Sequence, residues 1–331
     1  MNPRKLEFTV NEQVWPLDKP FRISRGSRTE AHVIVVTTSD GQHTGRAEAV
    51  PCKRYGETGA STIAQLEEMF SQDALRIDRQ QMQELLPAGA ARNALDCALW
   101  DLEAKVSGKH AWELANLPIV GEVTTAFTIS LDTPENMAAV AKANSDAPLL
   151  KLKLGGDDLD LPRVEAVKQG APGSRLIIDA NESWSPSHYC NTASALGRLG
   201  VELIEQPFPA EADDVLETLD HPVPVCADES CHISSDLPRL TNRYEVINVK
   251  LDKTGGLTEA LLLTERARKS GFKILIGCMV CTSLGIAPAR LLASAADYVD
   301  LDGPLLLAGD RHHGLPYHDG KIGMPSRELW G

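Results

Sequence analysis

The chain has 331 residues and a formal net charge of −13, with 33 Lys and Arg against 46 Asp and Glu. No dense run of basic residues occurs, which argues against nucleic acid or an anionic membrane surface as a partner. No apolar run approaches the ~18 residues of a membrane-spanning helix, and residues 1–17 lack the apolar core of a secretion signal. The chain has seven cysteines, an odd number that cannot all pair in disulfides. We therefore expect free thiols and a cytoplasmic location.

The N-terminal part of the chain combines strands with helices. Residues 6–17 and 30–50 alternate apolar and polar side chains and include a turn at 39–41, which predicts an antiparallel meander. Helical periodicity follows, in the ranges 62–70, 78–86 and 88–106. Strands followed by helices indicate an α+β domain, which we assign to residues 1–118.

From residue 119 the sequence alternates regularly between strands and helices. Successive strand ends lie about 25 residues apart, which is the length of one βα unit. The intervals between the strands can hold seven helices, although the one after Ser230 is short. The eight strand-like runs are 124–130, 149–154, 175–181, 201–207, 222–230, 245–252, 273–279 and 298–303.

Eight strands with seven connecting helices predict an α/β fold, a modified TIM barrel of the (β/α)7β type, in residues 119–306. An open doubly wound sheet is the alternative, but it would carry a G-x-G-x-x-G turn after its first strand. Gly155 and Gly156 follow the second strand and do not form that pattern. We therefore favour the barrel and assign residues 307–331 to a C-terminal segment that packs back on the N-terminal domain.

Three consecutive strands end in a carboxylate, namely Asp179, Glu205 and Asp228. The C-terminal ends of barrel strands meet on one face, so these groups would repel one another strongly without a cation. Oxygen ligands suit Mg²⁺ or Mn²⁺ rather than zinc. The alternative is three unrelated caps paired with Lys or Arg, but three carboxylates in register favour the metal.

Two lysines flank these carboxylates along the chain. Lys153 ends the strand before them and Lys250 ends the strand after them, so a closed barrel places the two on opposite sides of the metal. A free lysine has a pKa of about 10.4. Crowding by Lys151, the cation and partial burial would lower that pKa toward ~7–8, the range of a general base. The alternative is that each lysine only balances a carboxylate.

Other polar residues follow the same strand ends and are expected to line the same pocket. Thr128 ends the first strand, and Asn181 shares a face with the first carboxylate. Cys278 follows the seventh strand, and Asp300 and Asp302 share a face at the end of the last one.

Cysteine pairs offer a competing interpretation. Cys278 and Cys281 form a C-x-x-C pair, and Cys226 and Cys231 lie close together in the sequence, so a zinc or redox site is conceivable. The C-x-x-C pair does not follow the first strand of a thioredoxin-like unit, and Cys226 lies within an apolar run. Core or pocket-lining thiols are therefore favoured.

Through these residues and the motifs that contain them, the chain resembles the enolase superfamily. The resemblance covers nearly the whole chain and implies a capping domain on a (β/α)7β barrel, one Mg²⁺ per subunit with Mn²⁺ as a substitute, and removal of a proton α to a carboxylate. The resemblance implies that Asp179, Glu205 and Asp228 are the metal ligands. It also implies that Lys153 and Lys250 are the acid/base pair of the muconate-lactonising branch. Lys151 and Asn181 would support catalysis. The motifs are K-x-K (Lys151, Lys153), D-A-N (Asp179–Asn181), I-E-Q-P (Glu205), A-D-E-S (Asp228) and N-V-K-L-D-K-T-G-G (Lys250).

Within that branch the chain is most similar to the L-Ala-D/L-Glu dipeptide epimerases. The resemblance implies a 1,1-proton transfer at the α-carbon of the C-terminal residue of such dipeptides, in murein peptide metabolism. It implies that Arg25 faces the acidic side chain, that Asp300 and Asp302 receive the ammonium group, and that Thr128, Lys151 and Cys278 also contact substrate. The narrower motifs lie at Arg22–Arg28, Arg54–Glu57, Leu86–Leu102, Gly277–Ser283 and Asp300–Pro304.

Several alternatives stay open. Another racemase or cycloisomerase of the superfamily, such as an N-acylamino acid racemase or a muconate cycloisomerase, would use the same metal and lysines. A Schiff-base aldolase also uses a barrel lysine but has no need of three carboxylates, and a binding protein would not need the full set of charges. Homo-oligomerisation is compatible with the sequence.

Overall fold

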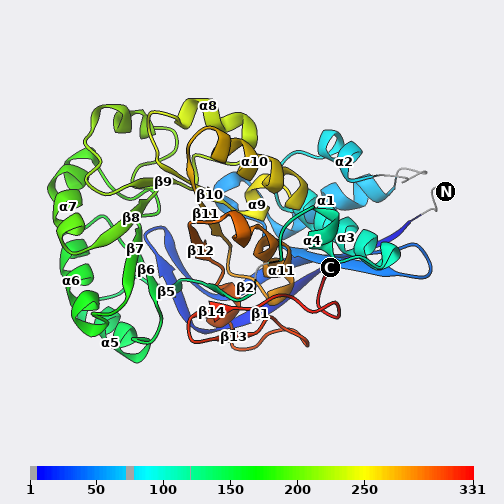
Figure 1. Cartoon of the computed structure of the whole chain (residues 1–331), viewed down its shortest axis with the longest axis horizontal. Coiled ribbons are helices and arrows are strands. Elements are labelled where there is room, and N and C mark those ends of the chain that lie inside the picture. Colours follow the sequence, from blue (N-terminus) through cyan, green and yellow to red (C-terminus); the bar gives the residue numbers. More distant parts are fainter. Residues whose placement is uncertain (1–5, 72–77, 120) are drawn as a thin grey trace.

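The computed structural model describes residues 6–71, 78–119 and 121–331. An antiparallel sheet with its helices occupies one side of the molecule, and a parallel sheet wrapped by helices occupies the other (Figure 1). The long hairpin of the antiparallel sheet extends from the N-terminal helices toward the parallel strands (Figure 1). No helix of the described part is long and apolar enough to cross a membrane.

The antiparallel sheet has the order β1-β2-β3 and confirms the predicted meander. Its first hairpin is longer than predicted, because β1 continues past a bulge between Pro16 and Phe21 and pairs with β2 up to Ile23 and Gly26. A side chain at Gly45 would overlap α3, so the glycine lets strand and helix pack closely. The elements are β1 (Glu7–Ile23), β2 (Gly26–Ser39), β3 (Thr44–Ala49), η1 (Lys53–Tyr55), α1 (Gly59–Phe70), α2 (Arg79–Leu85), α3 (Ala90–Ser107) and α4 (Ala111–Leu114).

Eight parallel strands form the second sheet, in chain order from β5 to β12. Ala126 N donates to Val299 O at 2.8 Å, which links the first strand to the last. The modified TIM barrel is confirmed, and its strands are rich in buried Val, Ile and Leu, as expected for a sheet covered on both faces. The strands are β5 (Phe127–Ile129), β6 (Leu149–Lys153), β7 (Arg175–Asp179), β8 (Val201–Glu205), β9 (Val225–Ala227), β10 (Val246–Val249), β11 (Lys273–Gly277) and β12 (Tyr298–Asp300).

The connections between these strands are less regular than predicted. The segment after β8 forms the 3-10 helix η2 (Asp213–Thr218), and the segment after β9 forms η3 (Ser234–Asp236) and the single turn α8 (Leu237–Leu240). Prolines at both ends of the first segment and the shortness of the second leave no room for a full α-helix. The longer helices are α5 (Pro134–Ala143), α6 (Asp160–Gly170), α7 (Pro186–Arg198), α10 (Leu257–Lys269) and α11 (Ser283–Arg290), with α9 (Leu251–Thr254) and η4 (Leu291–Ala295) beside them.

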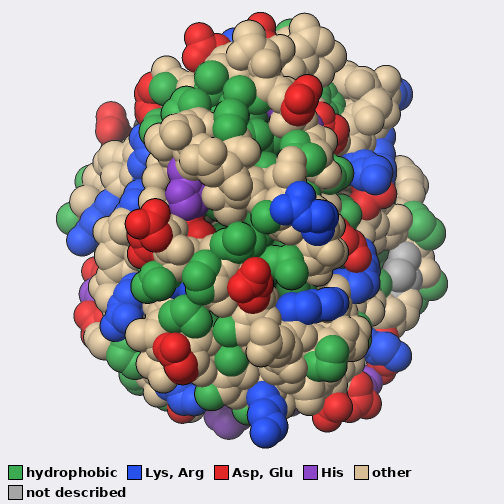
Figure 2. All heavy atoms as spheres, turned by 90° about the vertical axis from the view of Figure 1, so that its left-hand side faces the viewer, with side chains coloured by type: hydrophobic (Ala, Val, Ile, Leu, Met, Phe, Trp, Pro, Cys, Tyr) green, Lys and Arg blue, Asp and Glu red, His purple; other side chains and the backbone are tan. Residues whose placement is uncertain are grey.

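The outer face of the barrel, seen in Figure 2, mixes basic and acidic side chains without a concentration of one sign. Helices α5, α6 and α7 lie on this side of the molecule (Figure 1).

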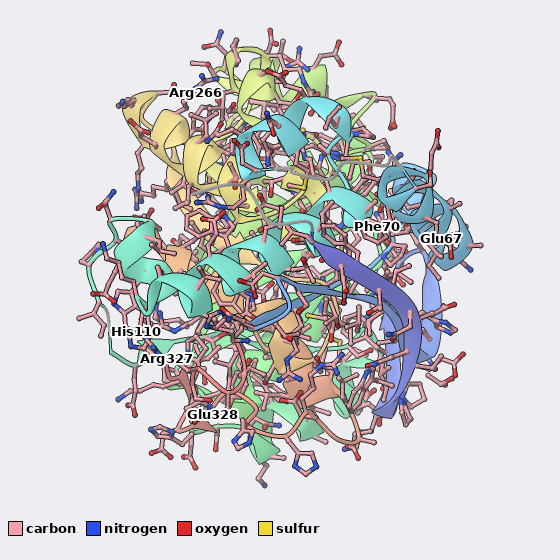
Figure 3. All side chains as sticks on the ribbon, turned by 90° about the vertical axis from the view of Figure 1, so that its right-hand side faces the viewer. Glu67, Phe70, His110, Arg266, Arg327 and Glu328 are labelled. Carbon is pink, nitrogen blue, oxygen red and sulfur yellow. The ribbon has the colours of Figure 1, made fainter. Side chains whose placement is uncertain are left out.

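The C-terminal segment returns to the N-terminal helices. The strand β14 (Lys321–Ile322) joins β4 (Val123–Thr124) and β13 (Tyr317–His318) in a small sheet, after η5 (Gly303–Leu306). Trp330 Nε1 donates to Cys97 O at 3.0 Å, and Arg327 lies beside His110 (Figure 3) with its Nη2 2.7 Å from Gly108 O. The boundaries between the three predicted units, at 118/119 and 306/307, stay a prediction. Residues 1–5 and 72–77 of the first unit lie outside the described residues.

Candidate active site

The strand register brings the predicted site residues to one end of the barrel. Lys153 on β6 is opposite Asp179 on β7, and Asp179 is opposite Glu205 on β8. Glu205 is opposite Cys226 on β9, two residues before Asp228. Since side chains two residues apart share a face of a strand, the register alone places the three carboxylates side by side.

The lysines contact these carboxylates directly. Lys151 Nζ lies 2.6 Å from Glu205 Oε2, 2.7 Å from Asp300 Oδ2 and 3.4 Å from Asp179 Oδ2. Lys153 Nζ lies 2.5 Å from Asp179 Oδ2. Lys250 follows β10 and places its Nζ 2.6 Å from Asp228 Oδ2. All of these side chains are buried, so the charges act on one another with little screening by water.

Ion pairing decides the protonation of these groups. Burial alone would raise the pKa of Asp179, but Lys153 and Lys151 outweigh it and hold that pKa at about 2. Burial and the charge of Asp179 raise the pKa of Glu205. Burial would lower the pKa of Lys250, yet Asp228 and Glu205 raise it above its usual range. The sequence predicted a lowered lysine pKa from crowding, whereas for Lys250 the carboxylates outweigh that crowding.

The three carboxylates suit a hard divalent cation. They are buried, lie on consecutive strands and offer only oxygen donors. Two of their oxygens, Glu205 Oε2 and Asp228 Oδ1, make no hydrogen bond although each lies near an ammonium group. Within the described ranges no group of three or more His, Cys, Asp or Glu side chains has an arrangement ready to hold a metal ion. Each of the three carboxylates instead contacts a lysine.

Two further groups hold the carboxylates, and no role in the site was predicted for either of them. Lys253 Nζ lies 2.7 Å from Asp228 Oδ1 and donates to the carbonyl oxygen of Asn248 at 2.9 Å. Asn248 Nδ2 donates to Glu205 Oε1 at 2.7 Å. Asn248 shares the inward face of its strand with Lys250, as the alternation of side chains along a strand predicts. Lys253 lies on α9, where strand alternation no longer applies.

Asp300 and Asp302 are both buried beside the lysine cluster, but they have different partners. Asp300 pairs with Lys151, and its Oδ1 makes no hydrogen bond. Asp302 Oδ2 accepts from the backbone N–H of Thr128 at 2.6 Å. Burial and the charge of Asp300 raise the pKa of Asp302 to about 7.

The cysteines are free thiols, as predicted, all seven lying within the described ranges. Cys278 is half-buried after β11, and a hydrogen bond to Cys278 together with burial raises the pKa of Cys281 well above its usual range. These two cysteines form no disulfide. They are thiols near the barrel mouth, which agrees with the favoured interpretation.

Arg25 reaches the barrel from the β1–β2 hairpin. Ser24 and Arg25 form the tight turn of this hairpin, between the paired residues Ile23 and Gly26. Ser24 Oγ donates to Asn181 O at 3.1 Å, and Arg25 Nη1 donates to the same oxygen at 2.8 Å. Farther along β1, the Phe21 ring lies 6.0 Å from Lys153 Nζ. The hairpin therefore covers the mouth of the barrel.

Two cavities adjoin the covered mouth. One of about 430 Å³ lies between the η1 loop and the barrel and is lined in part by Tyr55, Glu229 and Lys253. Another of about 350 Å³ lies between the hairpin and α5 and is lined in part by Phe21 and Thr128. The first cavity touches the cluster through Lys253, and the second reaches Thr128, whose backbone N–H donates to Asp302.

Two protein families and several relatives match this chain. Residues 5–115 match the mandelate racemase / muconate lactonizing enzyme N-terminal domain, and residues 133–328 match the enolase C-terminal domain-like family. The chain is 45% identical to an L-Ala-D/L-Glu epimerase of Escherichia coli, with 95% of this chain and 98% of that protein covered. It is 46% identical to an N-acetyl-D-glutamate racemase of Pseudoalteromonas sp., with 90% and 95% covered.

Solved structures agree with the sequence matches. An enolase family member from Agrobacterium tumefaciens with homology to dipeptide epimerases, which contains sodium and L-Ala-L-Glu, is 46% identical with a TM-score of 0.96, covering 98% of this chain and 100% of that one. A dipeptide epimerase from Methylococcus capsulatus complexed with Mg and L-Arg-D-Lys is 30% identical with a TM-score of 0.91, covering 98% of each chain.

Proposed function

The chain belongs to the mandelate racemase/muconate lactonizing enzyme family of the enolase superfamily, and we propose that it is an isomerase, a dipeptide epimerase acting on L-Ala-D/L-Glu. The observation that carries this proposal is the buried cluster at the barrel mouth, where three carboxylates on consecutive strands lie between two lysines. The identity to the Escherichia coli epimerase supports the substrate.

Asp179, Glu205 and Asp228 would hold one Mg²⁺ per subunit, and Mn²⁺ would substitute for it. The relative from Methylococcus capsulatus contains Mg together with its dipeptide. When bound, the cation supplies positive charge that stabilises the negative charge developing on the substrate carboxylate. Carboxylates shared with a cation attract a lysine proton less strongly, which is the condition that a lysine needs to act as a base.

Lys153 and Lys250 would exchange the α-proton. The strands β7, β8 and β9 lie between the strands that carry them, so the two ammonium groups approach from opposite sides of the carboxylates. One lysine removes the proton from the α-carbon, and the other delivers a proton to the opposite face. The roles exchange for the other epimer. Lys151 adds positive charge to the same region, and Asn181 supports the site through the carbonyl oxygen that holds the hairpin turn.

The remaining site residues would position the dipeptide. Asp300 and Asp302 are buried negative groups that can compensate a buried substrate ammonium, whose burial unpaired would cost several kcal/mol. Thr128 and Cys278 flank them at neighbouring strand ends. Arg25, on the hairpin turn above the barrel, would face the acidic side chain.

A second candidate substrate is an N-acylated glutamate. The Pseudoalteromonas relative is an N-acetyl-D-glutamate racemase and is as similar to this chain as the epimerase is. One contact favours this candidate: Asp300 is already paired with Lys151, so less negative charge is free for an ammonium group. Both reactions would use the same lysines and metal.

Proton NMR in D₂O distinguishes the two candidates. The protein with Mg²⁺ is incubated with L-Ala-L-Glu, L-Ala-D-Glu or N-acetyl-D-glutamate, and the Glu α-proton signal is followed. We expect rapid loss of that signal for both dipeptides, with formation of the other epimer, and no exchange in EDTA. Exchange of N-acetyl-D-glutamate alone would support the second candidate, and no exchange of any of them would contradict both.

Other features of the proposal concern the cell and the assembly. We propose a capping unit over residues 1–118, a barrel over 119–306 and a returning segment over 307–331. The proposed activity suits murein peptide recycling in the cytoplasm, and the seven free thiols support a reducing compartment. We also propose that the protein forms a homo-oligomer. Its ligand would be a small molecule, the dipeptide.

A further inference from the structure

Arg25 does not lie free above the barrel. Its Nη1 lies 3.0 Å from Glu182 Oε2, and its Nη2 lies 2.7 Å from Glu229 Oε1. The same Nη1 also donates to Asn181 O. Two carboxylates therefore share the cation that would receive an acidic substrate side chain.

The two carboxylates are not equivalent. Glu182 has a second cationic partner, because Arg54 Nε and Nη2 donate to its two oxygens at 2.8 and 2.9 Å. The backbone N–H of Ala210 also donates to Glu182, at 2.9 Å. Arg54 therefore neutralises Glu182 whether or not Arg25 stays in contact with it.

Among the described residues, Arg25 is the only one that forms an ion pair or a side-chain hydrogen bond with Glu229. Its side chain is only 2% exposed, and its Oε2 makes no hydrogen bond. It also lines the 430 Å³ cavity beside the site. An acidic substrate side chain would thus compete with Glu229 for Arg25, and the burial of Glu229 weakens the screening by water of the repulsion between the two carboxylates.

We propose that Glu229 is a specificity-determining residue, which weakens the preference of Arg25 for an acidic substrate side chain and so sets how far the enzyme also accepts neutral ones. The inference rests on the proposed dipeptide epimerisation. Glu229 acts here by sharing the guanidinium group of Arg25, which then offers the substrate less net positive charge. Without the charge of Glu229, more of the charge of Arg25 would be available to a substrate carboxylate, because Glu182 already has Arg54 as a partner.

The test compares L-Ala-L-Glu with L-Ala-L-Gln, two dipeptides of nearly equal shape that differ in the side-chain charge. The ratio of their kcat/KM values is measured at one fixed pH, with Mg²⁺, for the wild type and for Glu229→Gln. We expect the ratio to rise about tenfold in the variant, since a charge-assisted hydrogen bond is no longer shared. The ratio cancels any loss of metal affinity, because both substrates use the same reacting centre.

Three further variants define the outcome. Glu229→Asp keeps the negative charge, but the shorter side chain holds it farther from the Arg25 guanidinium group. The kcat/KM ratio of this variant should therefore lie between those of the wild type and Glu229→Gln. Glu211→Gln removes an exposed carboxylate that contacts Arg54 instead of Arg25, and it should leave the ratio unchanged. In an Arg25→Ala background, Glu229→Gln should no longer change the ratio.

The possible contrary results bear on two different claims. An unchanged ratio in active Glu229→Gln, or the same rise in the Arg25→Ala background, would overturn the inference while leaving the epimerase assignment intact. Failure of the wild type to exchange the α-proton of either dipeptide would overturn the assignment and the inference with it.

Discussion

Lys153 and Lys250 lie on either side of the carboxylates, each within 2.6 Å of one of them. If each lysine serves one face of the α-carbon, replacing either by Ala should reduce epimerisation at least about a hundredfold in both directions, because a general acid or base contributes roughly 10²–10⁴-fold. One variant should still exchange the α-proton of one epimer with D₂O, and the other variant that of its mirror. Deuterium incorporation followed by NMR measures this. Near wild-type epimerisation by either variant would rule out the two-base mechanism.

Asp228 is the carboxylate most strongly held in its ionised form. Lys250 and Lys253 keep its pKa well below the usual range despite complete burial. Asp228→Asn removes a charged ligand but nearly preserves the shape, so we expect Mg²⁺ affinity to fall at least about tenfold and turnover to fall with it. Titration calorimetry with Mg²⁺ measures the affinity directly. The exposed variant Asp158→Asn is the control, and an unchanged affinity in Asp228→Asn would remove it from the proposed ligand set.

Alternation within strands was a strong guide to single residues. Lys151, Lys153, Asp179 and Glu205 were predicted to point to one region, and the structure brings them into contact. The roles assigned to them stay proposals. Glu229 illustrates what the method misses, because its partner Arg25 lies on a hairpin far away in the sequence and no periodicity connects the two.

At the scale of elements, the parallel strands were predicted within a few residues of their ends, since each is a short apolar run bounded by polar groups. The connections were harder to predict. The apolar pattern of the segment between β8 and β9 fits an α-helix and a 3-10 helix equally well. Its prolines and its packing decide between the two. The extra length of the first hairpin was also missed, because its tip is polar and exposed.

A large side chain of the C-terminal segment packs against α3, beside a hydrogen bond from Gly331 N to Asp101 Oδ1. Trp330 is buried at 1% exposure, and its indole N–H donates to Cys97 O. Trp330→Ala should lower the free energy of unfolding by about 3–5 kcal/mol, because a large cavity forms. Trp330→Phe, which mainly loses the hydrogen bond, should cost about 1 kcal/mol. Denaturant unfolding measures both, with half-buried Trp112→Phe as the control. Equal stability of Trp330→Ala and wild type would show that the segment does not stabilise the fold.

At the scale of the whole molecule, the N-terminal unit and the barrel are joined by buried polar contacts as well as apolar packing. Asp252 on α9 accepts hydrogen bonds from Val50 N and Asn93 Nδ2, both at 2.8 Å. Arg92 on α3 donates to Thr254 O at 2.7 Å. Such contacts between segments far apart in the sequence could not be predicted from local patterns, although the two units themselves could.

Asp252 should make the stability of this interface depend on pH. Burial raises its pKa to about 7, and no cation is among the main contributors. Since the unfolded chain has a pKa near 3.8, the folded protein binds more protons than the unfolded chain between about pH 4 and pH 7. The contribution of this group to stability is therefore complete below about pH 4 and is lost progressively as the pH rises to about 7. The loss amounts to about 4 kcal/mol.

Asn at position 252 can still accept both hydrogen bonds but cannot ionise. We therefore expect Asp252→Asn to lose less stability than wild type between about pH 5 and pH 8, so that its advantage over wild type grows by a few kcal/mol across that range. Thermal and denaturant unfolding at several pH values measure the difference. Other titrating groups contribute equally to both proteins, and exposed Asp158→Asn should follow the wild-type curve. Parallel pH profiles for wild type and Asp252→Asn would show that Asp252 is already ionised at about pH 5, and that the carboxylate at this interface is stabilised by more than its two hydrogen bonds.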